Sequence, residues 1–149
     1  MRDRKIRIFW TNPIEIEGSI QSLDALFPGL YYITRVWGDH ETSLYIVKAT
    51  RTIKERLCIH NREWVHSYRG KIYVRIGKIV YPQNFDADII DHAESALIYE
   101  HRSILKDNTD KRDSYSYSEL YQIENTGNFY ELHPIVRMHD HPDYKYPNQ

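Results

Sequence analysis

The chain has 149 residues, 41% of them hydrophobic and 28% charged, and a formal net charge of −1. This composition excludes a disordered polymer, and no apolar stretch is long enough for a membrane span or a signal peptide. The single cysteine, Cys58, excludes an internal disulfide and any site built on several cysteines. We therefore expect one globular domain over residues 1–149, located in the cytoplasm and without a membrane partner.

The charges are distributed unevenly. Residues 1–75 carry 13 Lys and Arg against 8 Asp and Glu, whereas residues 76–149 carry 7 against 13. The excess of positive charge is greatest between Lys48 and Arg75. Such a segment could bind a phosphate backbone, but on charge alone a solvated helix face is the simpler explanation.

The first half of the chain predicts strands around one clear helix. Residues 5–10 alternate like a short edge strand, and residues 19–27 predict a short helix before Pro28-Gly29. Residues 30–37 and 43–49 are rich in strand formers, and their five-residue connection predicts an antiparallel hairpin. Residues 50–67 have helical spacing, set by Ile53, Leu57, His60 and Trp64.

The second half continues with a strand, a helix and a hairpin. Residues 71–80 alternate as a strand, and residues 86–103 predict a helix with acidic residues in its first turns. A polar loop over 108–113 leads to a second hairpin, in which residues 118–124 and 129–136 flank Asn125-Thr-Gly-Asn128. Tight hairpins imply a mainly antiparallel sheet with helices against it, which is an α+β fold.

One carboxylate stands on an apolar helix face. Ala87, Ile90, Leu97 and Ile98 lie within about 60° of Glu94 when residues are placed 100° apart around the predicted helix. A buried carboxylate needs a cation, which is either an arginine in a structural bridge or a bound metal. On this clue alone, the two interpretations stay equally open.

Further polar residues gather near the same predicted elements. Arg56 and His60 are four residues apart, so they share a helix face that points toward the sheet. Tyr31 and Tyr45 lie on the two hairpin strands, where tyrosines usually only pack. A nearby positive charge such as Lys48 could lower the pKa of a phenol enough for it to act as a base.

The spaced positions resemble the GIY-YIG nuclease domain. They are Gly29-Leu-Tyr31, Tyr45-Ile-Val-Lys48, Arg56 and His60, Glu94 within a helix, and Asn108 after it. Leu30 replaces isoleucine, and Val47 stands where the second motif has glycine. The resemblance covers residues 28–109, with an N-terminal extension (1–27) and a C-terminal extension with a hairpin (110–149). It implies a small three-stranded antiparallel central sheet flanked by helices.

The same resemblance implies a chemistry and a role for each residue. Glu94 would hold Mg²⁺ or Mn²⁺, and Tyr45 or Tyr31 would help to deprotonate the attacking water with the aid of Lys48. Arg56 would neutralise charge on the phosphate, and His60 would orient a tyrosine or relay a proton. Asn108 would fix the loop after the second helix or contact the phosphate. The basic residues Lys48, Arg51, Lys54 and Arg62 would contact nucleic acid.

We therefore expect a metal-dependent endonuclease that hydrolyses DNA, of restriction, repair or mobile-element type, with RNA left open as a substrate. A homodimer is expected if both strands of a duplex are cut. The alternative is a catalytically inactive module of this family that binds nucleic acid or protein, which Val47 and the near-neutral net charge favour.

Tyrosines are also frequent after residue 110. Tyr115, Tyr117, Tyr121, Tyr130, Tyr144 and Tyr146 could stack on bases or contact phosphates. They could equally cover the sheet edge or form a dimer surface, which we consider the better interpretation.

Overall fold

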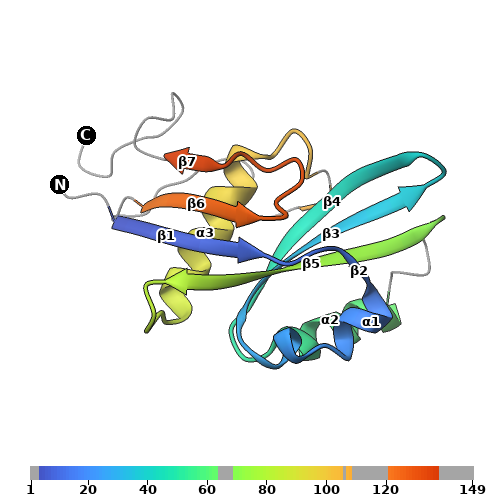
Figure 1. Cartoon of the computed structure of the whole chain (residues 1–149), viewed down its shortest axis with the longest axis horizontal. Helices are drawn as coiled ribbons and strands as arrows, with labels where there is room; N and C mark the ends of the chain where they lie inside the picture. The colour runs from blue at the N-terminus through green and yellow to red at the C-terminus, as the bar shows by residue number, and fades with distance from the viewer. Residues whose placement is uncertain (1–3, 64–68, 106, 109–120, 138–149) are drawn as a thin grey trace.

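The computed structural model describes residues 4–63, 69–105, 107–108 and 121–137. Within these ranges the strands are β1 (Arg4–Trp10), β2 (Ile14–Glu15), β3 (Gly29–Trp37), β4 (His40–Ala49), β5 (Lys71–Tyr81), β6 (Tyr121–Gly127) and β7 (Ile135–Arg137). The helices are α1 (Ile16–Ile20), the 3-10 helix η1 (Leu23–Leu26), α2 (Ile53–Glu63) and α3 (Ala87–Glu100). The strands form one curled mixed sheet in the order β4-β3-β5-β1-β6-β7, and β2 pairs with β5 (Figure 1).

The predicted fold class, a small three-stranded antiparallel sheet flanked by helices, is wrong. β3 is paired antiparallel with β4 and β5, but the sheet continues past β5 through β1 and the β6–β7 hairpin. β1 pairs antiparallel with β5 and parallel with β6, so it is an interior strand rather than the predicted edge strand. The alternating sequence of β1 reflects that one face of the strand is exposed. Alternation indicates which face of a strand is buried, but it does not indicate whether other strands pair with both of its edges.

The local elements between residues 29 and 100 follow the predicted order. The expected strands, helix, strand and helix correspond to β3, β4, α2, β5 and α3. The predicted short helix over 19–27 is instead split into α1 and η1. Residues 64–67 with Trp64, the predicted polar loop from 109 to 113, and residues 118–120 lie outside the described residues. The division into a core over 28–109 and two extensions stays a prediction.

Apolar side chains pack against both faces of the sheet. α3 covers one face, where Ile90 and Leu97 meet side chains of β1, β3, β4 and β6, among them Ile6, Leu30, Ile46 and Ile123. α1 and α2 cover the other face over β3, β4 and β5, where Ile53 and Leu57 meet Ile33, Val74 and Ile76. Figure 1 shows α3 and the α1–α2 pair beside different parts of the sheet. Consecutive residues of β3 and β4 therefore face different helices.

Two glycines allow β3, β5 and β1 to pack closely. A Cβ atom added at Gly29 would lie 2.7 Å from the carbonyl oxygen of Gly77, and one added at Gly77 would lie 2.7 Å from the ring of Trp10. These separations are too short for a real Cβ atom, and the first involves backbone that cannot turn away. The glycine of Gly29-Leu-Tyr31 therefore has a packing role between β3 and β5.

A buried histidine joins the end of α3 to the segment between β6 and β7. His101 is 2% exposed; its Nδ1 donates to the carbonyl oxygen of Leu97 at 2.8 Å, and its Nε2 accepts from the backbone N–H of His133 at 2.8 Å. Burial lowers the pKa of His101 to about 4, and the nearby His133 also lowers it. Only the neutral imidazole can accept the bond from His133.

This arrangement predicts acid-dependent stability. The pKa of His101 is about 4 in the folded chain against 6.5 when unfolded, so the unfolded state binds more protons between these values. The stabilisation is complete above pH 6.5 and is lost as the pH falls toward 4, at up to about 1.4 kcal/mol per pH unit. His101→Gln retains one donor and one acceptor without titrating. Urea unfolding at several pH values should therefore give a shallower pH dependence for this variant, and an unchanged dependence would contradict the assignment.

Candidate functional site

Two tyrosines and one histidine meet between the sheet and α2. Tyr31 on β3 lies opposite Val47, and Tyr45 on β4 lies opposite Ile33, so both tyrosines project from the α2 face. His60 follows Ile53 and Leu57 by seven and three residues, which places it on the buried side of α2. Its Nδ1 lies 3.0 Å from the Tyr31 hydroxyl and 3.2 Å from the Tyr45 hydroxyl.

His60 is neutral at neutral pH. Burial and, to a smaller extent, the positive charge of Arg56 lower its pKa to about 4. A neutral imidazole nitrogen has either one lone pair or one proton, so the two hydroxyl groups compete for the same Nδ1 atom. Both hydroxyl groups lie close enough to Nδ1 for a proton to be exchanged without a large movement of heavy atoms.

Two opposite charges act on Tyr31. Burial raises the pKa of the Tyr31 phenol, the charge and hydrogen bonding of Arg56 lower it, and the negative charge of Glu94 raises it. The net effect is a raised pKa, because the Tyr31 side chain is fully buried. Arg56 is exposed on α2 and Glu94 is on α3, so groups from both helices act on the same hydroxyl.

Glu94 reaches this region around the edge of the sheet. It is 7% exposed on α3, and its Oε2 accepts a hydrogen bond from the backbone N–H of Lys48 at 2.6 Å. β4 ends the strand order, and its described strand partner is β3. The carboxylate therefore satisfies an outward-facing amide of the edge strand, in addition to its charge effect on Tyr31.

Asn108 forms hydrogen bonds with the same strand edge at Ile46, two residues before Lys48. Its Oδ1 accepts from the N–H of Ile46 and its Nδ2 donates to the carbonyl oxygen of Ile46, both at 3.0 Å. The side-chain amide thus replaces a neighbouring strand at one residue. Of the two roles expected for Asn108, fixing the loop after the second helix is the one that this geometry supports.

The side chain of Lys48 does not lie beside the two tyrosines. It lies opposite Leu30 on the other face of the hairpin, and its Nζ forms an ion pair with Asp91 Oδ1 at 2.6 Å. Its charge is not among the causes that shift the pKa of Tyr31, whereas that of Arg56 is. The arginine is therefore better placed than the lysine to act on this phenol.

The remaining expected residues lie on or near α2 and β4. Arg51 and Arg62 are exposed and Lys54 is half-buried. The Nε atom of Arg51 lies 3.9 Å from Oε2 of Glu55. Val47 is directly opposite Tyr31 and packs against the core on the α2 side. Its side chain occupies space that the motif glycine would leave open beside the tyrosine.

Sequence reasoning missed the ion pair between Asp91 and Lys48 and the extent to which the β4 edge organises the site. Asp91 precedes Glu94 by three residues, so helical spacing places both carboxylates toward β4. This spacing was an available signal. Of the tyrosines after residue 110, Tyr121 is buried and Tyr130 is 41% exposed, whereas Tyr115, Tyr117, Tyr144 and Tyr146 lie outside the described residues.

No family model, no curated protein and no solved structure matches this chain. Among the described residues, no three His, Cys, Asp or Glu side chains are grouped so that they could hold a metal ion together. The helices within these ranges are all too short or too polar to cross a membrane.

The Asn108 contacts predict a graded loss of stability. Asn108→Ala removes both hydrogen bonds to Ile46 and should lower the free energy of unfolding by about 1–3 kcal/mol. Asn108→Asp keeps the acceptor for the N–H but removes the donor and places a carboxylate against a carbonyl oxygen. Urea unfolding at neutral pH measures both variants, and an alanine variant as stable as the parent chain would contradict a structural role.

Proposed function

We propose that this chain is a metal-dependent endonuclease of the GIY-YIG type that hydrolyses phosphodiester bonds of DNA, with RNA as a second possible substrate. The observation that carries the proposal is the convergence of Tyr31 and Tyr45 on one nitrogen of His60, with Arg56 and Glu94 acting on the same hydroxyl. A proton-transfer group, a cation and a carboxylate in one place are the components that phosphodiester hydrolysis requires. The proposal rests on these side chains and not on the strand topology of the sheet.

Tyr45 is the better candidate for contact with the attacking water. It is 8% exposed, whereas Tyr31 is fully buried with a raised pKa and serves as a positioning residue. The water would give a proton to the Tyr45 oxygen, and Tyr45 would pass its own proton to Nδ1 of His60. This transfer needs the neutral imidazole that burial favours. An approaching anionic phosphate would raise the pKa of His60 and so make it a stronger proton acceptor.

Arg56 and Glu94 supply the charges. Arg56 is exposed beside Tyr31, where its guanidinium can bind a phosphate and neutralise charge that grows on it. Mg²⁺ is usually bound by one or two carboxylates together with substrate phosphates and water, so Glu94 fits as the protein ligand of Mg²⁺ or Mn²⁺. Bound there, the cation would stabilise negative charge on the scissile phosphate.

The expected partners follow from the same proposal. Arg51, Lys54 and Arg62 on and beside α2 would contact the nucleic-acid backbone, and Lys48 would support Glu94 through its backbone N–H. One site per chain favours a homodimer if both strands of a duplex are cut. The cytoplasmic location expected from the single cysteine is kept as part of this proposal.

An inactive nucleic-acid-binding or protein-interaction module is the second candidate. The observation that favours it is Val47, whose side chain lies opposite Tyr31 and packs beside it. If Val47 closes the access of a phosphate, the hydroxyl–imidazole cluster is only a buried polar contact that fixes α2 against the sheet.

Cleavage assays with a matched pair of variants separate the two candidates. Supercoiled plasmid and a structured RNA are incubated with Mg²⁺, Mn²⁺ or EDTA. Glu94→Gln keeps an oxygen for the Lys48 amide but loses the charge, and it should cut at least about 100-fold more slowly. Asp91→Asn, one helical turn away, removes the charge that Asp91 contributes to a partly exposed ion pair and should cut like the parent chain.

The melting temperatures of both variants serve as the folding control. Equal cleavage by Glu94→Gln and the parent chain would contradict the role of Glu94. Absence of cleavage by the folded parent chain on both substrates would favour the inactive module.

A further inference from the structure

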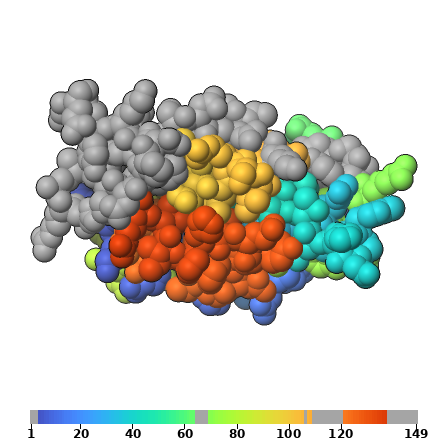
Figure 2. All heavy atoms as spheres, turned by 90° about the horizontal axis from the view of Figure 1, so that it is seen from above, coloured from blue at the N-terminus to red at the C-terminus, as the bar shows by residue number. Residues whose placement is uncertain are grey.

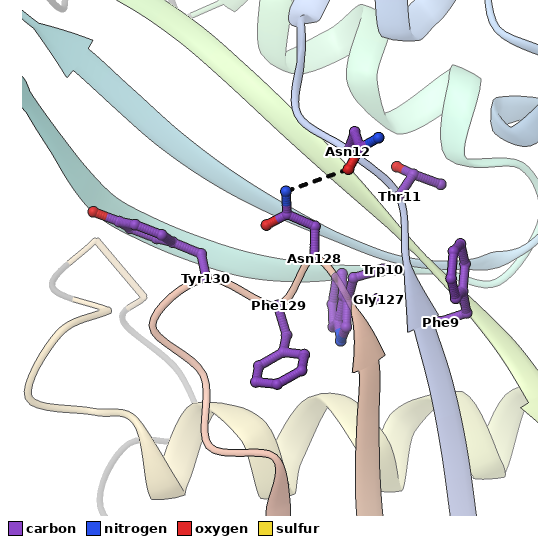
Figure 3. Close-up of a pocket in the computed structure, with 8 residues that line it drawn as sticks. All are labelled: Phe9, Trp10, Thr11, Asn12, Gly127, Asn128, Phe129 and Tyr130. Atoms are coloured by element: carbon purple, nitrogen blue, oxygen red, sulfur yellow. Dashed lines mark hydrogen bonds between the residues drawn. The ribbon is translucent and has the colours of Figure 1, made fainter.

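A hollow of about 640 Å³ lies where β1 and β6 end, at the start of the segments that follow them (Figure 3). The residues that line it include two exposed aromatic residues, Phe9 and Tyr130, and two that carry side-chain amides, Asn12 and Asn128. We call it the amide pocket. None of its lining residues belongs to the Tyr31–Tyr45–His60 site, so the two are separate features of the molecule.

A buried arginine fixes the orientation of one amide. Arg75 is 3% exposed, and its Nε donates to Asn128 Oδ1 at 3.0 Å. Glu41 holds the same guanidinium by accepting from Nη1 at 2.7 Å. Because a guanidinium can only donate, the oxygen of the Asn128 amide must face Arg75 and its NH₂ group must face away. The NH₂ group is therefore presented to the amide pocket.

The two asparagines together offer a donor beside an acceptor. Asn128 Nδ2 points toward Asn12 Oδ1 at 3.4 Å, as the dashed line in Figure 3 shows. This separation is long for an N–H···O hydrogen bond, so a ligand can replace the contact at low cost. The ligand would need an acceptor for Nδ2 next to a donor for Oδ1. The Watson–Crick edge of an unpaired nucleobase carries such a pair.

Two exposed aromatic side chains flank this amide pair in the view of Figure 3. Phe9 is 43% exposed and Tyr130 is 41% exposed, and Figure 3 shows Asn12 and Asn128 between them. Tyr130 is held in place by its hydroxyl, which donates to the carbonyl oxygen of Glu41 at 3.0 Å, and by the Arg75 guanidinium 4.8 Å from its ring centroid. Its backbone is in the left-handed region at φ 46°, a strained conformation that surrounding contacts must maintain.

We propose that the amide pocket binds one unpaired nucleobase of the nucleic-acid substrate. Asn128 and Asn12 pair with the base edge, and the exposed rings of Phe9 and Tyr130 provide surfaces for stacking. A base inside a regular duplex has this edge occupied by its partner, so the pocket selects a bulged, flipped or single-stranded base. The assignment rests on the proposed function, because a nucleic-acid substrate is what brings such a base to the chain.

Binding of the full chain in EDTA tests this pocket without metal-dependent cleavage. The probes are a short DNA duplex with one bulged 2-aminopurine, its fully paired counterpart, and free AMP as competitor. Anisotropy of an end label gives the affinity, and 2-aminopurine emission reports stacking of the base. The ratio of the two duplex affinities cancels any general effect of a substitution on backbone binding.

Three variants locate the interaction. Phe9→Ala removes a stacking ring, and Asn128→Asp keeps an oxygen for Arg75 but replaces the NH₂ donor with an acceptor. Phe27→Ala is the matched control, because this phenyl ring is 61% exposed and does not line the pocket. The melting temperature of each variant is measured first. If either Phe9→Ala or Asn128→Asp is unstable, the binding result of the other variant decides the test.

The parent chain and Phe27→Ala should prefer the bulged duplex by about tenfold, with changed 2-aminopurine emission, and both pocket variants should lose this preference. Equal affinity of the parent chain for the two duplexes, or an undiminished preference in the folded pocket variants, would overturn the proposal. Displacement of the duplex by AMP at a similar concentration would also overturn it, in favour of a free-nucleotide site.

The two proposals can fail separately. A preference for the bulged duplex without cleavage would count against the hydrolytic function alone, and cleavage without such a preference would count against the pocket alone.

Discussion

Two phenol groups lie in the apolar layer between the sheet and α2, and each needs a hydrogen-bond partner there. His60 lies within reach of both, since its Nδ1 is within hydrogen-bonding distance of Tyr31 and of Tyr45. A buried hydroxyl without a partner costs about 1–3 kcal/mol, so the contact ties the β3–β4 hairpin to α2 at one atom. Burial in this layer, together with the charge of Arg56, keeps His60 neutral. A structural constraint thereby creates a group that can exchange protons.

The open edge of β4 provides the second half of the site. Glu94 and Asn108 satisfy its outward-facing backbone groups at Lys48 and Ile46, and this places an acidic side chain from α3 close enough to act on Tyr31. The contact between α3 and the edge strand is thus also what brings the carboxylate to the tyrosines. Val47 counts against access of a phosphate to this site, because its side chain fills space beside Tyr31.

Much of the candidate site could be predicted from the sequence because it depends on short-range periodicity. Helical spacing placed His60 and Glu94 on inward faces, and the hairpin brought Tyr31 and Tyr45 together. Alternation along β4 would also have separated Lys48 from Tyr45, because residues three apart face opposite sides of a strand. The sheet could not be predicted in this way. The parallel pairing of β1 with β6 joins segments more than a hundred residues apart, as in Arg4 opposite Tyr121, and the amide pocket depends on the same distant pairing.

The most direct test is the protonation state of His60, followed by NMR of ¹⁵N-labelled histidine and assigned with a His60→Gln variant. We expect a neutral imidazole at neutral pH that takes up a proton only near its lowered pKa of about 4. We also expect Tyr31→Phe and Tyr45→Phe each to shift the Nδ1 resonance, because both hydroxyl groups compete for that atom. Titration of His60 at the ordinary pKa of 6.5, with an Nδ1 resonance that neither substitution changes, would rule out this role of His60.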